Sequence, residues 1–318
     1  MSRFTVLATP RSFAQRDQAP IRLLEKNGCH VIRLPQNGCD LMEDLWKYIP
    51  LADGIIAGLE PYDASLLERA GQLKIISRYG VGYDKVDLQV ARRLGIRVAI
   101  TPGANGDSVA DLAVALMLSA ARNICPMNQA IREGLPNKPI SGVEMWKKTL
   151  GVVGTGRIGK GVIQRASGFG MSILANDAYP DEEFLCTYGG SYVDLDTLFA
   201  QSDFITLHAP LTPETKNLVD ERRLSLMKPS AILVNTARGG IVDEDALYCA
   251  LKEKRIAAAA LDATLEEPAC RSNLAQLPNC ILTPHAGAAT AEAANNMGMM
   301  AAQNLLQVLN GEDCHNLV

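Results

Sequence analysis

Residues 147–162 read KKTLGVVGTGRIGKGV, an apolar run typical of a buried strand, followed by a glycine-rich turn and the start of a helical pattern. Gly154, Gly156 and Gly159 have the spacing G-x-G-x-x-G. The first glycine permits a tight turn, the second lets the backbone approach a pyrophosphate, and the third lets the helix pack on the strand. The helix N-terminus adds N–H donors and positive potential. This stretch therefore predicts a dinucleotide-binding unit of strand, turn and helix.

An acidic residue follows at the distance that such a unit requires. The next strand pattern, SILAND, ends in Asp177, 23 residues after Gly154, where a carboxylate can accept hydrogen bonds from the adenosine ribose. Taken alone, Asp177 is equally well explained as a turn residue before Ala-Tyr-Pro, but the register of the whole unit favours the ribose contact. The residues that follow, AYPDEE, contain no Lys or Arg for a 2′-phosphate, so the sequence predicts NAD rather than NADP.

Short apolar runs alternate with helical stretches along the rest of the chain. FTVLAT, HVIRL, DGIIAG, LKIISRY and IRVAI precede the glycine turn, and DFITLHAP, AILVNTA, AAAALDAT and CILTPHAG follow it. This alternation predicts an α/β protein with doubly wound parallel sheets. Because the second series has its own glycine turn, we predict two such domains, residues 1–100 with 290–318, and residues 101–289. A long apolar helix is expected over 108–122, an irregular polar stretch up to 148, and a final helix over 291–310 that returns to the first domain.

The composition is that of an ordinary soluble enzyme. The net charge of −4 and the lack of a basic run give no reason to expect nucleic acid or an anionic membrane as a partner. The N-terminus has no apolar span of signal-peptide length, and the most apolar helix pattern contains Asp111 and is too short to cross a bilayer. We therefore expect a cytoplasmic protein. The eight cysteines are scattered without C-x-x-C spacing or a nearby His, so neither a metal site nor a disulfide framework is expected.

An arginine ends one of the apolar runs. The segment 231–245 reads AILVNTARGGIVDED, with Arg238 immediately before two glycines. Most arginines lie at the surface with a solvated head group, and that explanation applies here too. However, a strand followed by Gly-Gly in an alternating chain delivers its last side chains to the carboxyl edge of a parallel sheet, where open α/β folds bind ligands. Arg238 is therefore a candidate for holding an anionic substrate.

A nicotinamide-dependent enzyme also needs a group that donates or accepts a proton. Of the four histidines, only His208 and His285 end strand patterns of the second series, and position alone does not separate them. The loop ALDATLEEPA carries Glu266 and Glu267 ahead of a proline, whereas the surroundings of His208 offer only Glu214. A carboxylate beside a histidine orients it and raises its pKa, so we predict His285 as the proton donor.

Together, the motifs ISRYGVGYDKVDL, GVVGTGRIG, LHAPLTPETKNLV, LVNTARGGIVDEDAL, ALDATLEEPA and LTPHAGAAT resemble the D-isomer-specific 2-hydroxyacid dehydrogenase family, which includes phosphoglycerate dehydrogenases. The resemblance covers nearly the whole chain. It implies a Rossmann NAD domain inserted into a flavodoxin-like substrate-binding domain, usually in a homodimer. It also implies that Arg238 binds the carboxylate and carbonyl of a 2-oxo acid, that His285 transfers the proton, and that Glu267 sustains the protonated histidine.

The same resemblance assigns the remaining site residues. Asp262 would contact the nicotinamide carboxamide, and the glycine loop at residues 80–82 would offer N–H donors to the substrate carboxylate, although a simple strand-ending turn is the alternative. The predicted substrate-binding residues are Arg78, Val81, Gly82, Arg238 and His285. The predicted cofactor-binding residues are Gly154, Gly156, Arg157, Ile158, Gly159, Asp177, His208, Ala209, Pro210, Thr236, Ala237, Asp262 and Gly287.

The chain departs from the family pattern at several positions. LDATLEEP replaces a motif that often carries an aromatic residue, so the pocket wall near Thr264 is expected to differ. Phosphoglycerate dehydrogenases commonly have an arginine in the loop after the third strand, where this chain has AGLEPYDA with Glu60. Arg78 matches a basic residue of that subgroup, but it is also explained as a strand-end surface arginine. The sequence stops near Val318, so we expect no appended regulatory domain of the kind found in longer phosphoglycerate dehydrogenases.

Two classes of function remain. The first is an NAD-dependent oxidoreductase that transfers a hydride between NAD(H) and a small D-2-hydroxy or 2-oxo acid, with D-3-phosphoglycerate one candidate and reduction of hydroxypyruvate or glyoxylate the alternative. The second is an NAD-sensing binding protein similar to the C-terminal binding protein corepressors. Turnover of a 2-oxo acid that is lost in a His285→Ala variant distinguishes the first class from the second.

Overall fold

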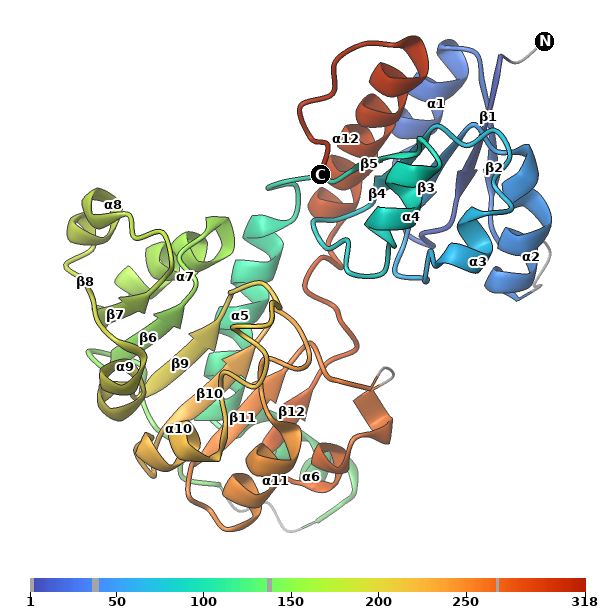
Figure 1. Cartoon of the computed structure of the whole chain (residues 1–318). Coiled ribbons are helices and arrows are strands. Elements are labelled where there is room, and N and C mark those ends of the chain that lie inside the picture. Colours follow the sequence, from blue (N-terminus) through green and yellow to red (C-terminus); the bar gives the residue numbers. More distant parts are fainter. Residues whose placement is uncertain (1–2, 36–39, 136–138, 267–268) are drawn as a thin grey trace. The chain divides into compact units, whose positions relative to one another are not determined.

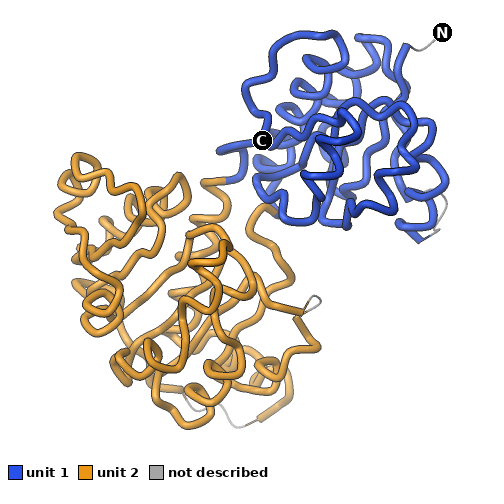
Figure 2. Tube along the Cα trace, viewed as in Figure 1, with its two compact units in different colours: residues 1–105, 289–318 blue, residues 106–288 orange. Residues whose placement is uncertain are grey.

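The computed structural model describes residues 3–35, 40–135, 139–266 and 269–318. The chain forms two compact units, Met1–Asn105 with Ala289–Val318, and Gly106–Ala288 (Figure 2). The chain first passes from one unit to the other after Asn105, a few residues beyond the predicted boundary at 100. Thr101 still belongs to the first unit, because it is buried and its N–H donates to the Gly80 carbonyl at 3.0 Å.

The first unit contains a five-stranded parallel sheet of order β2-β1-β3-β4-β5 (Figure 1). This is the flavodoxin-like order. Its strands are β1 (Phe4–Ala8), β2 (Cys29–Arg33), β3 (Gly54–Ala57), β4 (Ile75–Arg78) and β5 (Arg97–Ala99). One face packs on α1 (Ala19–Lys26) and α12 (Ala291–Asn310), and the other on α2 (Leu41–Tyr48), α3 (Ala64–Leu67) and α4 (Leu88–Arg93), with the one-turn η1 (Ile49–Leu51) after α2. The final helix has the predicted bounds.

The second unit contains a seven-stranded parallel sheet of order β12-β11-β10-β9-β6-β7-β8. Its strands are β6 (Thr149–Val153), β7 (Ser172–Asn176), β8 (Ser191–Tyr192), β9 (Phe204–Leu207), β10 (Ile232–Asn235), β11 (Ala258–Leu261) and β12 (Cys280–Leu282). The chain adds strands outward from β6 in one direction as far as β8, and from β9 in the opposite direction as far as β12, so the strand order reverses between the paired strands β6 and β9. In open α/β sheets this switch point is where ligands bind. Both sheets are parallel, as the alternating sequence pattern predicts.

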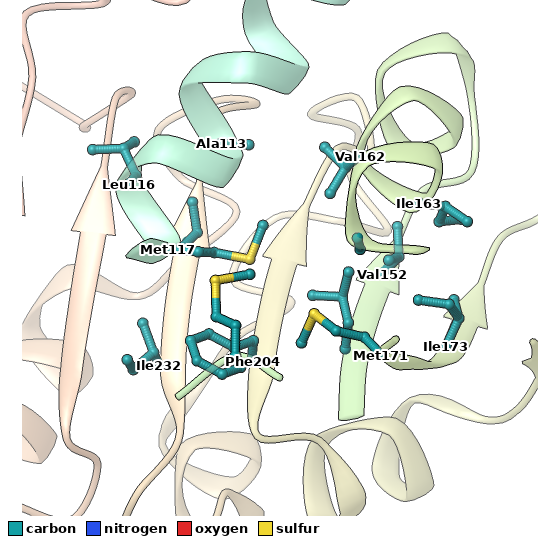
Figure 3. Close-up of a cluster of buried hydrophobic side chains, with 14 of the residues drawn as sticks. Ala113, Leu116, Met117, Val152, Val162, Ile163, Met171, Ile173, Phe204 and Ile232 are labelled. Atoms are coloured by element: carbon teal, nitrogen blue, oxygen red, sulfur yellow. The ribbon is translucent and has the colours of Figure 1, made fainter. Parts of the chain in front are cut away.

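Helices cover both faces of the second sheet. α5 (Gly106–Ala121) and α7 (Arg157–Ser167) lie on one face, where Leu116, Met117 and Val162 pack on Phe204 and Ile232 of the strands (Figure 3). The opposite face packs on α9 (Leu195–Gln201), α10 (Glu221–Leu226) and α11 (Glu244–Lys252), and α8 (Glu182–Thr187) precedes β8. Two single turns, η2 (Ala269–Arg271) and η3 (Asn273–Gln276), precede β12. Because one face of each helix and both faces of the central strands are buried, their apolar residues recur with the spacing that predicts helices and strands.

Aspartates set the beginnings of most of the short helices. An Asp side chain accepts a hydrogen bond from a backbone N–H of the first turn in each case, which satisfies a donor that has no partner within the helix. These N-terminal caps are Asp40, Asp63, Asp87, Asp181, Asp194, Asp220 and Asp243. Each cap determines the residue at which a helix begins, and therefore where the loop before that helix ends.

One helix was not expected. The polar stretch after residue 122 contains α6 (Ile124–Arg132), none of whose residues is buried. It has apolar residues at helical spacing, Ile124, Met127 and Ile131, which the sequence analysis did not use. Among the described residues, no single helix is long and apolar enough to cross a membrane; α5 and α6 reach that length only as a pair bent by 66°, and α5 is largely buried in its unit.

Candidate active site

The glycine turn lies at the end of β6, at the switch point of the second sheet. Gly154 has φ 91°, a left-handed conformation that favours glycine, and its N–H donates to the Asn176 carbonyl at 2.8 Å. A Cβ atom at this position would lie 2.6 Å from the Ala209 nitrogen and 2.7 Å from the His208 carbonyl carbon. The loops that follow β6 and β9 are therefore in contact, and only glycine permits it.

The start of α7 has the space that a bound pyrophosphate requires. A Cβ at Gly159 would overlap the Gly154 carbonyl, so this glycine lets the helix pack against the turn. By contrast, a Cβ at Gly156, the N-terminal cap of α7, would have no atom within 4 Å. Arg157 is exposed and Ile158 is half-buried in the first turn. An open helix N-terminus with a glycine at its cap fits an anionic group.

Asp177 follows β7 and is tied to the glycine turn. Its Oδ2 accepts hydrogen bonds from the Thr155 N–H at 2.5 Å and the Thr155 hydroxyl at 3.1 Å, and its Oδ1 accepts one from the Tyr179 N–H at 2.8 Å. These bonds orient the carboxylate beside the turn, where it fits a ribose. Lys160, a cation of α7, forms an ion pair with Asp181 and so is already engaged by a carboxylate.

His208 ends β9 and is held by two threonines. Its Nε2 lies 2.9 Å from the Thr206 hydroxyl and its Nδ1 lies 3.4 Å from the Thr236 hydroxyl. Burial lowers the pKa of His208 to about 3, so the ring is neutral at physiological pH. A neutral imidazole is a weak acid near neutrality, which adds a second reason, besides the nearby glutamates, for the prediction of His285 as the proton donor. Ala209 is half-buried and Pro210 is exposed beside it.

Arg238 lies in the turn after β10, and buried groups set its position. The Asn235 side chain, fully buried, donates to the Arg238 carbonyl at 2.8 Å and accepts from the Ala237 N–H at 3.0 Å. The Arg238 Nη1 donates to the Ala237 carbonyl at 2.8 Å. A Cβ at Gly239 would overlap the Thr264 carbonyl, so the turn packs tightly against the chain that follows β11. Arg238 is half-buried at the carboxyl edge of the sheet.

His285 lies in the loop after β12, and Asp262 holds that loop. Asp262 follows β11, is 4% exposed, and accepts hydrogen bonds from the Thr283 hydroxyl at 2.5 Å, the Ala286 N–H at 2.7 Å and the Gly287 N–H at 2.8 Å. His285 itself has φ 53°, a left-handed conformation that non-glycine residues rarely adopt. The Asp262 carboxylate therefore holds the histidine in an otherwise unfavourable conformation.

This role of Asp262 was missing from the sequence analysis, which assigned the residue only a contact with the cofactor. The missed signal is positional: Leu261 and Leu282 are register partners, so Asp262 and Thr283 follow paired residues of adjacent strands. Strand order, which brings β11 beside β12, was needed to find it.

Hydrogen bonds hold the described segment that ends at Glu266. Glu244, at the start of α11, accepts hydrogen bonds from the Leu265 N–H at 2.6 Å and the Ser272 hydroxyl at 3.1 Å. The Thr264 hydroxyl donates to the Glu266 carbonyl at 2.8 Å. Glu267, the predicted partner of the catalytic histidine, lies outside the described residues, so its role stays a prediction.

The other predicted substrate-binding residues belong to the first unit. Arg78 ends β4, is 2% exposed, and donates from Nε to the Gly82 carbonyl at 2.8 Å. It is thus a buried arginine that holds the turn at residues 80–82, not a solvated one. Val81 and Gly82 are half-buried in that turn. The three residues lie at the carboxyl edge of the five-stranded sheet.

Comparison with known proteins places these features in a family. The model of the NAD-binding domain of D-isomer specific 2-hydroxyacid dehydrogenases matches residues 114–287. A glyoxylate reductase of Thermococcus litoralis is 42% identical over 312 residues, which cover 90% of this chain and 94% of the relative. A D-3-phosphoglycerate dehydrogenase of Methanocaldococcus jannaschii is 46% identical over 255 residues, covering 80% of this chain and 49% of that protein.

A solved structure with bound ligands has the same architecture. The D-lactate dehydrogenase of Aquifex aeolicus, in complex with NAD and lactic acid, has a TM-score of 0.83 and 29% sequence identity, with 98% of each chain covered. The similarity therefore extends over both units and not only over the glycine motif.

Proposed function

The chain belongs to the D-isomer-specific 2-hydroxyacid dehydrogenase family and is an NAD-dependent oxidoreductase of small 2-hydroxy and 2-oxo acids, and we propose that Arg238 and His285 carry its reaction. The observation that supports this is the arrangement at the carboxyl edge of the second sheet. The Arg238 turn follows β10, the His285 loop follows β12, and Asp262 lies between them at the end of β11.

Arg238 binds the substrate. A guanidinium presents a planar fork of donors that matches a carboxylate and a neighbouring carbonyl oxygen, and it draws electron density from the carbonyl carbon that is to be reduced. The bonds between Asn235 and the Arg238 turn hold the backbone in place, so less conformational freedom is lost on binding.

His285 supplies the proton. In the direction of reduction, the protonated ring donates to the carbonyl oxygen, and in oxidation the neutral ring accepts the proton of the substrate hydroxyl. Glu267 is the proposed partner that sustains the protonated form. Gly156, the start of α7 and Asp177 would hold the pyrophosphate and ribose of NAD, which when bound would supply or accept the hydride.

The test is NADH oxidation with glyoxylate and other 2-oxo acids by the purified protein. His285→Ala is expected to lower kcat by about 10²–10⁴-fold, the typical contribution of a positioned acid or base. Arg238→Lys is expected to raise KM and lower kcat/KM, because an ammonium ion has no planar fork. His315→Ala, which changes an exposed histidine of the C-terminal segment, is the matched control. Full activity of the His285→Ala variant, with native thermal stability, contradicts the assignment.

A homodimer is the second part of the proposal. Four apolar side chains on or after α6 are exposed in the described part of the second unit: Ile124, Ile131, Leu135 and Ile140 are 50%, 60%, 52% and 46% exposed. Apolar surface of this kind is typical of a protein interface. The expected partner is a second copy of the chain. Ile131→Asp is expected to shift the sedimentation coefficient from dimer to monomer, whereas Asn128→Asp on the same helix is not; a monomeric parent protein contradicts the proposal.

A further inference from the structure

The turn that carries Arg238 is covered by one peptide group of the segment after β11. A Cβ at Gly239 would overlap the Thr264 carbonyl and lie 2.6 Å from the Leu265 nitrogen. The carbonyl and the nitrogen belong to the same peptide group, which therefore lies against the Gly239 Cα. Gly239 directly follows Arg238, and both segments belong to the second unit. The position of this peptide group therefore limits the positions that the Arg238 backbone can adopt.

One buried side chain already joins these two segments. The Asn235 Nδ2 donates to the Arg238 carbonyl at 2.8 Å and, over a longer distance of 3.5 Å, to the Ala263 carbonyl. Asn235 thus binds both segments just before the point where they touch. The peptide group that covers Gly239 is held by a different side chain.

That side chain is Glu244, the first residue of α11. Its Oε1 accepts a hydrogen bond from the Leu265 N–H at 2.6 Å, and its Oε2 accepts one from the Ser272 hydroxyl at 3.1 Å. The Ser272 hydroxyl in turn accepts a hydrogen bond from the Leu274 N–H at 3.3 Å. Hydrogen bonds to a charged acceptor are about twice as strong as those between neutral groups. Both carboxylate oxygens are thus engaged, and together the two bonds fix the orientation of the carboxylate.

The start of α11 is itself held to the rest of the second unit. The Asp243 N–H donates to the Val219 carbonyl at 3.0 Å, and the Asp243 carboxylate caps the helix by accepting a hydrogen bond from the Ala246 N–H at 3.0 Å. An acidic side chain in the first turn of a helix is favourable in itself, which is the simpler explanation of Glu244. That explanation does not account for a carboxylate whose two oxygens bind two segments outside the helix.

We infer that Glu244 is a positioning residue for the substrate-binding Arg238. It holds the Thr264–Leu265 peptide group against Gly239, and this contact keeps the arginine turn in the position that binds a 2-oxo acid. The inference rests on the proposed function of Arg238. Glu244 acts through the peptide group and takes no part in proton or hydride transfer. Its effect can be large, because a displacement of about 1 Å in a binding group can cost about 100-fold in rate.

The experiment measures NADH oxidation with glyoxylate, and the affinity for NADH by fluorescence titration without glyoxylate. Glu244→Ala frees the peptide group, so kcat/KM for glyoxylate is expected to fall about tenfold or more, mainly through a raised KM. The Kd of NADH is expected to change by less than about threefold, because contacts that do not include Glu244 hold the glycine turn and Asp177.

Three matched variants separate this role from support of the helix. Glu244→Gln keeps an oxygen for the Leu265 N–H and is expected to retain most of the parent's kcat/KM. Glu244→Asp keeps the charge at the start of α11 but is one methylene shorter, so it is expected to resemble Glu244→Ala. Asp245→Asn removes an exposed carboxylate from the same turn of the helix and is expected to match the parent protein. If Glu244→Ala does not fold, Glu244→Asp takes its place in every comparison.

A double-mutant cycle with Arg238→Lys shows whether Glu244 acts through the arginine. Arg238→Lys already lacks the planar fork that requires a fixed position. In that background, Glu244→Ala is expected to lower kcat/KM by less than about threefold, because the two substitutions disturb the same contact and their effects are not additive.

Failure of the inference and failure of the proposed function give different results. The role of Glu244 is overturned, and the proposed function stands, if Glu244→Ala has the kinetics of the parent, if the effects of the two substitutions multiply, or if the affinity for NADH falls as much as kcat/KM. An Arg238→Lys protein with the kinetics of the parent overturns the proposed function, and the inference with it.

Discussion

The Asp262 carboxylate provides a sharp test of how the site is held. Asp262→Asn retains Oδ1 for the Thr283 hydroxyl and the Ala286 N–H, but turns an amide NH₂ toward the Gly287 N–H. One hydrogen bond to a charged group is lost, worth about 1.5–3 kcal/mol, and a buried donor is left facing another. We expect the free energy of unfolding of the second unit to fall by about 3 kcal/mol. A unit of this size then melts roughly 6–12 °C lower.

The same substitution is expected to lower kcat by roughly 10–100-fold, because His285 loses the support of its left-handed conformation and catalysis is sensitive to displacements of about 1 Å. Melting is measured without NADH, and turnover with saturating NADH. Asp313→Asn, an exposed carboxylate, is the control, and Thr283→Val, which removes one of the three donors, should be milder. An Asp262→Asn protein that melts like the parent but has a raised KM for NADH would refute this reasoning and leave Asp262 only as a contact to the cofactor.

Four other outcomes follow from the same geometry. Gly239→Ala is expected to cost about 1–3 kcal/mol and to reduce turnover, since its methyl meets the Thr264 backbone, as chemical denaturation and kinetics would show. Gly156→Ala, in open space, should keep the melting temperature but weaken NADH binding in fluorescence titrations; unchanged affinity would argue against pyrophosphate there. Asp177→Ala should raise the ratio of NADPH to NADH use by about tenfold, because a charge that repels the 2′-phosphate is removed. The pKa of His208 is about 3 in the folded protein and about 6.5 in the unfolded protein, so the unfolded state is protonated first and the free energy of unfolding falls as the pH drops from 6.5 towards 3, by at most about 1.4 kcal/mol per pH unit. Urea titrations should show that the free energy of unfolding of His208→Asn depends less on pH than that of the parent. An equal pH dependence of the two proteins would count against the lowered pKa.

Local patterns in the sequence predicted much of the fold. Both parallel sheets follow from apolar runs that alternate with helical stretches, and α12 has the predicted bounds. The G-x-G-x-x-G spacing predicted the turn after β6, including the position where only glycine fits. These features depend on residues close in sequence. α6 was missed although Ile124, Met127 and Ile131 have helical spacing, because the stretch was interpreted as irregular from its polar composition.

Contacts between distant residues were decided by the tertiary structure. Position in the sequence did not separate His208 from His285, and only the nearby glutamates favoured His285; the tertiary structure adds that burial lowers the pKa of His208. Asp262 holds the His285 loop because β11 and β12 are adjacent.

The sequence by itself determined the α/β class, the dinucleotide turn and the residue types available for chemistry, because periodicity and spacing are local properties. It placed Glu60 in the loop after the third strand, but did not show that the hydroxyls of Thr9 and Tyr62 both donate hydrogen bonds to one oxygen of its carboxylate. Strand order and burial determine which groups meet at a sheet edge and in which protonation state. Both depend on the packing of segments far apart in the chain, so only the tertiary structure decided them.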